Sequence, residues 1–87
     1  MKIIEIKNIE DCFDGSFIKE LFLDEQITKE YILLLKEKGE LKYYPTFARP
    51  FFSFEIEDVM NIKGVEGNYS IRIWMKNEKA IEIFQNL

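Results

Sequence analysis

The chain has 87 residues, a formal net charge of -4, no histidine and one cysteine, and 47% of its residues are hydrophobic. This length and composition predict one soluble globular domain over residues 1–87. Without histidine the commonest general base and metal ligand is missing, and one cysteine cannot build a zinc or iron–sulfur site. The composition therefore argues against a metal, against a cofactor and against most forms of catalysis.

No segment of the sequence is suited to a membrane. The longest strongly apolar run, Tyr31 to Leu35, falls far short of the roughly 20 residues that a membrane-spanning helix needs. Glu5 and Lys7 interrupt the apolar stretch that a secretion signal would require, and the single Cys12 agrees with a reducing compartment. We therefore expect a cytoplasmic protein.

The first elements in chain order are a strand, a turn and an ambiguous segment. The β-branched residues of IIEIKNI predict a strand, with Ile4 and Ile6 on one face, and Asp14-Gly15 predicts a turn. Residues 17–23, FIKELFL, alternate as a strand would, but Ile18, Leu21 and Phe22 also fit one helical turn. We favour a helix here.

The clearest helix follows at about residues 25–38, where apolar residues recur at helical spacing. Asp24 is positioned to cap its first turn, and Gly39 to end it in a left-handed conformation. Residues 41–47 and 51–57 then predict a hairpin, with Pro45 placing its first strand at a sheet edge.

The last third of the chain predicts a loop, a strand and a helix. Residues 58–67, with two glycines, read as a loop with at most a short helical turn. Residues 69–76 alternate clearly, with Tyr69, Ile71, Ile73 and Met75 inward and Ser70, Arg72, Trp74 and Lys76 outward. Asn77 is suited to cap a final helix that includes Ala80, Ile81, Phe84 and Leu87.

These elements predict an α+β fold, in which a small, mainly antiparallel sheet of about four strands has two helices packed on one face. A ferredoxin-like split βαβ arrangement is the alternative. Residues 62–73, IKGVEGNYSIRI, resemble the turn into an edge strand of heavy-metal-associated domains, which implies a shared architecture. The paired-cysteine metal loop of those domains is absent.

Aromatic residues are the most unusual feature, since six of them fall within YYPTFARPFFSF, residues 43–54. Phe52, Phe54 and one of Tyr43 and Tyr44 are expected in the core. The strand pleat then turns Phe51 and the other tyrosine outward. Tyrosine, tryptophan and arginine are enriched at binding hot spots, so the predicted partner-binding residues are Tyr44, Arg49, Phe51, Arg72 and Trp74.

A different arrangement of the outward side chains is also open. Arg72 could pair with Glu55 across neighbouring strands while Trp74 lies flat over a loop. In that case neither side chain would be offered to a partner.

The leading functional hypothesis is a non-catalytic interaction module that binds a protein partner or forms a homodimer through this sheet face. One alternative is a sensor or enzyme subunit that holds a planar ligand at residues 43–54. A weaker one is single-stranded nucleic-acid binding, against which the net acidity argues. The acidity is concentrated in residues 1–40, which hold ten acidic and six basic residues, against six of each in residues 41–87.

Overall fold

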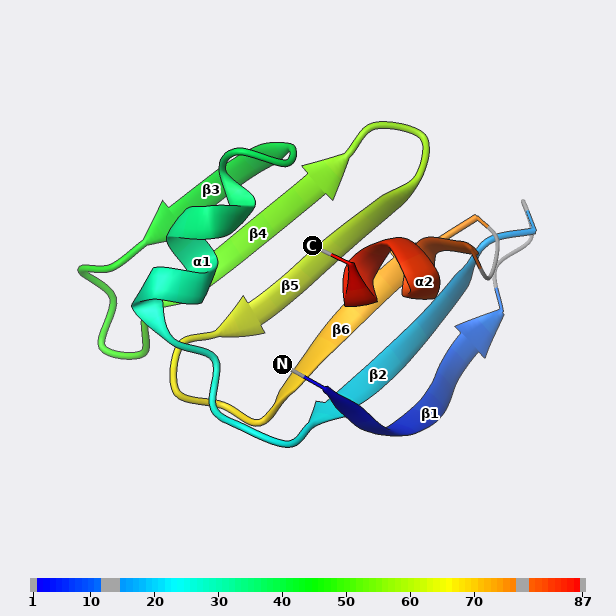
Figure 1. Ribbon diagram of the computed structural model, residues 1–87, viewed down its shortest axis with the longest axis horizontal. Helices are drawn as coiled ribbons and strands as arrows, with labels where there is room; N and C mark the ends of the chain where they lie inside the picture. The colour runs from blue at the N-terminus through cyan, green and yellow to red at the C-terminus, as the bar shows by residue number, and fades with distance from the viewer. Residues whose placement is uncertain (1, 12–14, 77–78, 87) are drawn as a thin grey trace.

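The computed structural model describes residues 2–11, 15–76 and 79–86. Cys12, the turn at Asp14, the helix cap at Asn77 and the terminal Leu87 lie outside these residues. Within them, a six-stranded antiparallel sheet carries two helices of seven residues each (Figure 1). The radius of gyration is 12.3 Å, close to the value of about 12 Å expected for a compact chain of this length.

The strands make up most of the structure. They are β1 (Ile3–Asp11), β2 (Phe17–Leu23), β3 (Glu40–Tyr44), β4 (Phe51–Ile56), β5 (Met60–Val65) and β6 (Ser70–Met75). The helices are α1 (Lys29–Leu35), between β2 and β3, and α2 (Lys79–Gln85), after β6. The predicted fold class is therefore wrong: the chain has a mostly-β fold with six strands rather than an α+β fold with about four.

The sheet order is β1-β2-β6-β5-β4-β3, and every neighbouring pair is antiparallel. An N-terminal hairpin, β1 and β2, joins the four-stranded meander β3 to β6 through the pairing of β2 with β6. A ferredoxin-like plan needs a second crossover helix at residues 58–67, where the chain instead forms β5, so the ferredoxin-like alternative is also wrong. Strand β3 lies at an edge, as the proline that follows it predicted.

Two segments became strands against expectation, for the same physical reason. Residues 17–23 form β2, in which Leu21 and Leu23 are buried while Phe17 packs against the core from the same side. In β5, Met60 and Ile62 are buried while Asn61 and Lys63 face the other way. Both segments alternate, but each is short, and neighbouring strands on both sides supply the hydrogen bonds that decide its conformation.

Helix α1 is shorter than predicted, and its ends differ. Thr28 caps it, accepting a hydrogen bond from the Tyr31 amide at 3.1 Å. Asp24 instead accepts a bond from the Lys2 amide at 2.9 Å, which ties the start of β1 to the end of β2. Gly39 does not have a positive φ; a Cβ there would lie 2.5 Å from the Glu55 carbonyl oxygen. Its small size thus serves close packing rather than a left-handed cap.

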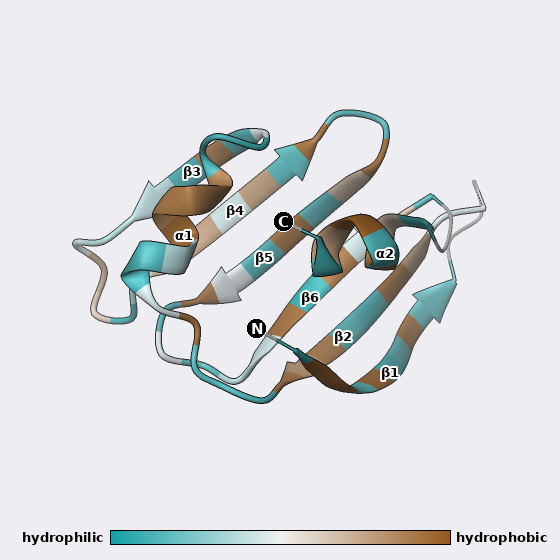
Figure 2. Ribbon diagram, in the orientation of Figure 1, coloured by the Kyte–Doolittle hydropathy of each residue, from teal (hydrophilic) through white to brown (hydrophobic). Residues whose placement is uncertain are grey.

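One hydrophobic core lies between the sheet and the helices. Hydrophobic and hydrophilic residues alternate along the strands (Figure 2), and the hydrophobic ones on one side pack under α1 and α2, which both lie on that side (Figure 1). Helix α1 contributes Ile32 and Leu35, and α2 contributes Ala80 and Phe84. We call the opposite side of the sheet the open face.

Candidate functional site

The open face carries a row of polar side chains, five of them charged, that crosses all six strands. Cross-strand pairing places these residues directly side by side in the order Lys42, Ser53, Lys63, Arg72, Glu20 and Lys7. We call this set the basic row, because its four cations flank a single carboxylate. The Ser70 hydroxyl donates a hydrogen bond to the Glu20 carboxylate at 3.0 Å.

Lys63 and Arg72 stand directly opposite each other at the centre of this row. Like charges in this position repel, and the pair is destabilising unless an anion lies between them. Neither side chain forms a hydrogen bond or ion pair with any of the described residues. Both are exposed and available to an incoming anion.

Three aromatic rings stack beside one end of the basic row. Tyr44 lies between Phe47 and Phe51, with ring centroids 5.3 Å and 6.0 Å away. Phe47 is 56% exposed and Tyr44 40%, so the stack presents apolar surface to solvent. Stacked rings of this kind form a rigid contact surface at little entropic cost.

Trp74 lies on the other side of the basic row, next to Asn61 on β5 and Ile18 on β2. Its indole is half-buried, with the Lys76 ammonium 6.0 Å from the ring centroid. Asn61 beside it has a buried side-chain oxygen that finds no hydrogen-bond partner among the described residues. The helices cover the other side of the sheet, so the indole is not beneath them.

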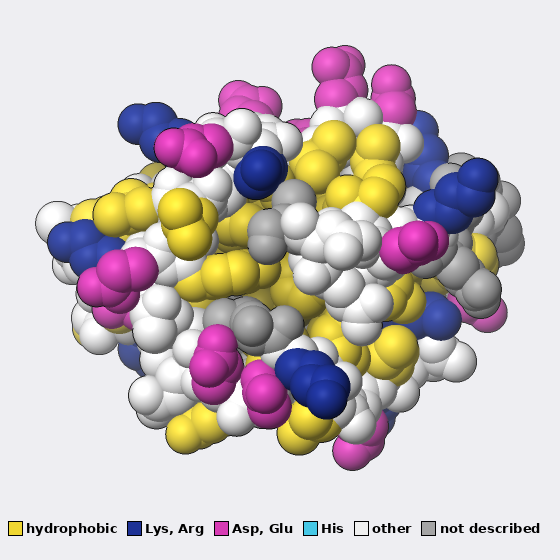
Figure 3. Space-filling model, viewed as in Figure 1, with side chains coloured by type: hydrophobic (Ala, Val, Ile, Leu, Met, Phe, Trp, Pro, Cys, Tyr) yellow, Lys and Arg dark blue, Asp and Glu magenta, His cyan; other side chains and the backbone are white. Residues whose placement is uncertain are grey.

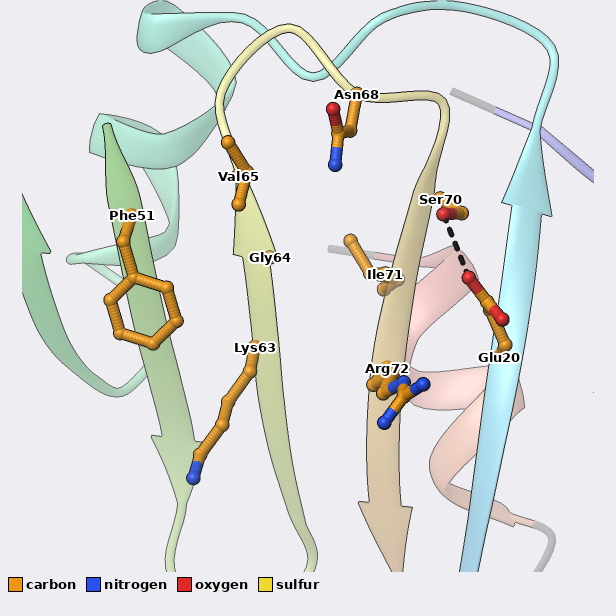
Figure 4. Close-up of a pocket in the computed structure, with 9 residues that line it drawn as sticks. All are labelled: Glu20, Phe51, Lys63, Gly64, Val65, Asn68, Ser70, Ile71 and Arg72. Carbon is orange, nitrogen blue, oxygen red and sulfur yellow. Dashed lines mark hydrogen bonds between the residues drawn. The ribbon is translucent and has the colours of Figure 1, made fainter. Parts of the chain in front are cut away.

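Between the stacked rings and the basic row is a shallow pocket of about 220 Å³. Phe51 and Lys63 line one side of it, and Arg72 and Ser70 line the other, with the Asn68 amide at one end (Figure 4). The backbone of Gly64 forms part of the pocket wall. A side chain at this position would point the other way, into the core toward Phe52. The pocket thus combines two cations, an amide, an aromatic ring and the Glu20 carboxylate on one surface.

The structure brings the five predicted residues to this face and the turns beside it. Tyr44 and Phe51 are neighbours, Phe51 and Arg72 line the same pocket, and Arg72 and Trp74 alternate along β6. Arg49, in the β3–β4 turn, donates to the side-chain oxygen of Asn68 at 3.3 Å. The outward direction predicted for Arg72 and Trp74 is found, whereas Tyr69, expected inside, is 55% exposed.

The alternative pairing of Arg72 with Glu55 is wrong. The missed strand β5 lies between their strands, so Glu55 pairs with Asn61, and the neighbours of Arg72 are Lys63 and Glu20. Sequence reasoning overlooked Lys63, which belongs to the segment interpreted as a loop, and Asn68, which directly follows that segment. The alternation of residues 60–63 was the signal that could have identified Lys63.

Two tyrosines have raised pKa values. On the core side of β3, the Tyr43 hydroxyl donates a hydrogen bond to a Glu66 carboxylate oxygen. That bond and the nearby negative charge raise the pKa of Tyr43 above its usual value. In α1, burial raises the pKa of Tyr31 to about 12. Both hydroxyls therefore stay protonated at neutral pH and neither can act as a base there.

The helix side has a smaller set of exposed apolar residues. Hydrophobic side chains reach the surface over α1 and between the two helices (Figure 3), and Leu34 is 60% exposed. No aromatic stack or row of opposed cations accompanies them among the described residues. The open face is therefore the richer candidate for binding.

Comparisons of the chain with protein-family models, with curated proteins and with solved structures find no match. In the described residues, no three acidic or cysteine side chains gather closely enough to hold a metal ion. No helix within the same ranges is long and apolar enough to span a membrane.

Proposed function

We propose that this protein is a non-catalytic cytoplasmic binding module that docks a partner protein on the open face of its sheet. The observation that carries this proposal is the position of Trp74, Phe51 and Tyr44 on the side away from both helices. Aromatic and arginine side chains together are typical of binding hot spots. Outward-facing aromatic side chains of this kind, here on both sides of the basic row, commonly mark an interaction site on a small domain.

A partner of different sequence suits this face better than a second copy. Face-to-face packing of two copies about a centred two-fold axis would bring the middle of the basic row onto itself. Lys63 and Arg72 would then meet the same cations of the other copy, which is unfavourable. A homodimer through this face would need an offset arrangement that avoids this contact.

The stacked rings also support a second candidate, the binding of a planar ligand at residues 43–54. The pocket beside Phe51 holds about 220 Å³, whereas sites for drug-sized ligands usually measure roughly 300 to 1,000 Å³. The rings of Tyr44, Phe47 and Phe51 already stack on one another, so a ligand would have to lie on their outer surface. A thermal-shift screen with metabolites and nucleotides tests this candidate, because any bound compound raises the melting temperature.

Affinity capture at native expression, followed by quantitative mass spectrometry, tests the main proposal. We expect Trp74→Ser and Tyr44→Ser to reduce recovery of a specific partner at least about tenfold, as loss of a hot-spot ring does. Leu34→Ser is the matched control, because it removes an exposed apolar side chain from the other face. Undiminished recovery with both open-face variants would contradict the proposal.

Light scattering on the same proteins detects self-association. A dimeric wild-type protein and a monomeric Trp74→Ser variant would identify a second copy as the occupant of this face. We expect a monomer in both cases.

A further inference from the structure

We infer that Lys63 and Arg72 form an anion site that receives a glutamate or aspartate side chain of the docked partner. This inference rests on the proposed function, because it names the chemistry by which the open face recognises its partner. The argument starts from the unusual placement of the two cations. They face each other across β5 and β6 with no carboxylate between them.

The surroundings of the pair are suited to a carboxylate. Arginine binds carboxylates through two parallel hydrogen bonds, and a lysine on the opposite side adds a second charge. Ser70 and Asn68 line the same pocket and carry further polar groups. One carboxylate, Glu20, also lines this pocket. It accepts a hydrogen bond from Ser70 and stands on the far side of Arg72 from Lys63, so the space between the two cations stays open to a partner's carboxylate.

The surface beside the pocket is also suited to the partner residue that neighbours the acidic one. Phe51 forms the wall closest to Lys63 (Figure 4). Its ring stacks on Tyr44, which in turn stacks on Phe47. An apolar or aromatic residue beside the partner's carboxylate would rest on these rings. The open face thus fits a short protein segment in which an acidic residue is flanked by aromatic ones.

The same face argues against a polyanion such as single-stranded nucleic acid. Glutamates stand on both sides of the basic row, since Glu40 and Glu55 pair next to one side of it and Glu5 lies on the other. The formal net charge of -4 adds a general repulsion. Successive phosphates would meet these carboxylates, whereas a single carboxylate enters only the space between Lys63 and Arg72.

Titrations followed by amide NMR shifts test the inference on the intact protein. The probes are the peptide acetyl-Ser-Tyr-Glu-Tyr-Ser-amide, its glutamine counterpart, sodium phosphate and a short oligothymidylate. We expect the glutamate peptide to shift the amide signals of Lys63, Gly64 and Arg72. It should bind about tenfold more tightly than the glutamine peptide, because the neutral glutamine side chain cannot form the charge-assisted hydrogen bond.

Variants assign the effect to the two cations. Arg72→Gln and Lys63→Gln are each expected to weaken the glutamate peptide at least about fivefold. Lys7→Gln, at the β1 end of the same row, is the control and should leave binding unchanged. All three positions are exposed, so the folds should be preserved, and the NMR spectra verify this directly.

Three results would overturn the inference: equal affinity for the two peptides, an undiminished response in Arg72→Gln, or tighter binding of phosphate or oligothymidylate than of the glutamate peptide. Such a failure is separate from that of the proposed function. Partner capture depends on Trp74 and Tyr44, whereas the peptide titration depends on Lys63 and Arg72.

Discussion

At the scale of single residues, Asn61 shows that the centre of the open face is not optimised for stability. Its buried side-chain oxygen has no hydrogen-bond partner in the described part of the chain, and asparagine is disfavoured in strands. Burying a polar atom without a partner costs about 1 to 3 kcal/mol. A valine of similar size would avoid that cost.

We therefore expect Asn61→Val to raise the free energy of unfolding by about 1 kcal/mol, measured by urea denaturation. Ser53→Val is the matched control, because Ser53 lies on the same face but its hydroxyl is not a buried atom without a partner. The control should gain less, since it reports strand propensity alone. A loss of stability in Asn61→Val would show that this amide makes a favourable interaction.

Single residues also show which part of the candidate site could be predicted. The outward direction of Trp74 and Arg72 follows from the alternation of residues 70–75, since neighbouring strand residues must point to opposite faces. The neighbours of Arg72 do not follow from it. Lys63 reaches Arg72 only because β5 inserts beside β6, and no local pattern encodes that pairing.

At the scale of elements, close contacts between backbones decide where the chain can turn from α1 into β3. Gly39 lies against β4, where an added Cβ would be 2.5 Å from the Glu55 carbonyl oxygen. At Gly64, on β5, the nearest atom would belong to the Phe52 side chain, at 2.9 Å. A backbone atom in a sheet can move less than a ring edge can.

We therefore expect Gly39→Ala to lower the free energy of unfolding by about 2 to 3 kcal/mol, and Gly64→Ala by about 1 to 2 kcal/mol. Urea denaturation of the two variants measures both values. Lys38→Ala, an exposed neighbour of Gly39, should change stability by less than about 0.5 kcal/mol. A larger loss of stability in Gly64→Ala than in Gly39→Ala would mean that β3 shifts easily relative to β4.

Elements also differ in how well their sequence specifies them. The helical spacing of residues 27–35 predicted α1, and the hairpin of β3 and β4 followed from the two strands predicted at residues 41–47 and 51–57. Strand β2 was assigned to a helix, because seven residues contain both patterns. Its pairing with β1 on one side and β6 on the other excludes the helical alternative.

At the scale of the whole molecule, the pairing of β2 with β6 joins the two ends of the chain in one sheet. The buried side chains of the N-terminal hairpin, Leu21 and Leu23, belong to the same core as Ile71 and Ile73 of β6. Neither the hairpin nor the meander covers its apolar side alone. The two parts should consequently unfold together.

This predicts superimposable urea denaturation curves from far-ultraviolet circular dichroism, which reports all strands, and from the fluorescence of Trp74, the only tryptophan. Leu21 is fully buried, so Leu21→Ala should lower the free energy of unfolding obtained from each curve by about 2 to 5 kcal/mol. Both curves should move to lower urea together. Because Trp74 lies next to Ile18 of β2, a change in fluorescence at lower urea than the main loss of circular dichroism would indicate that the β1–β2 hairpin unfolds on its own.

The alternation along the recognised strands was enough to place Phe51, Arg72 and Trp74 outside, because the two-residue period of a strand is a local property. It left open which of Tyr43 and Tyr44 faces the core, and it placed Tyr69, which is 55% exposed, inside. Only the tertiary structure decided that there are six strands, in what order they pair, and that Lys63 stands opposite Arg72. Strand pairing joins residues up to tens of positions apart, so the hydrogen bonds and shared core that select it have no signature within any short segment.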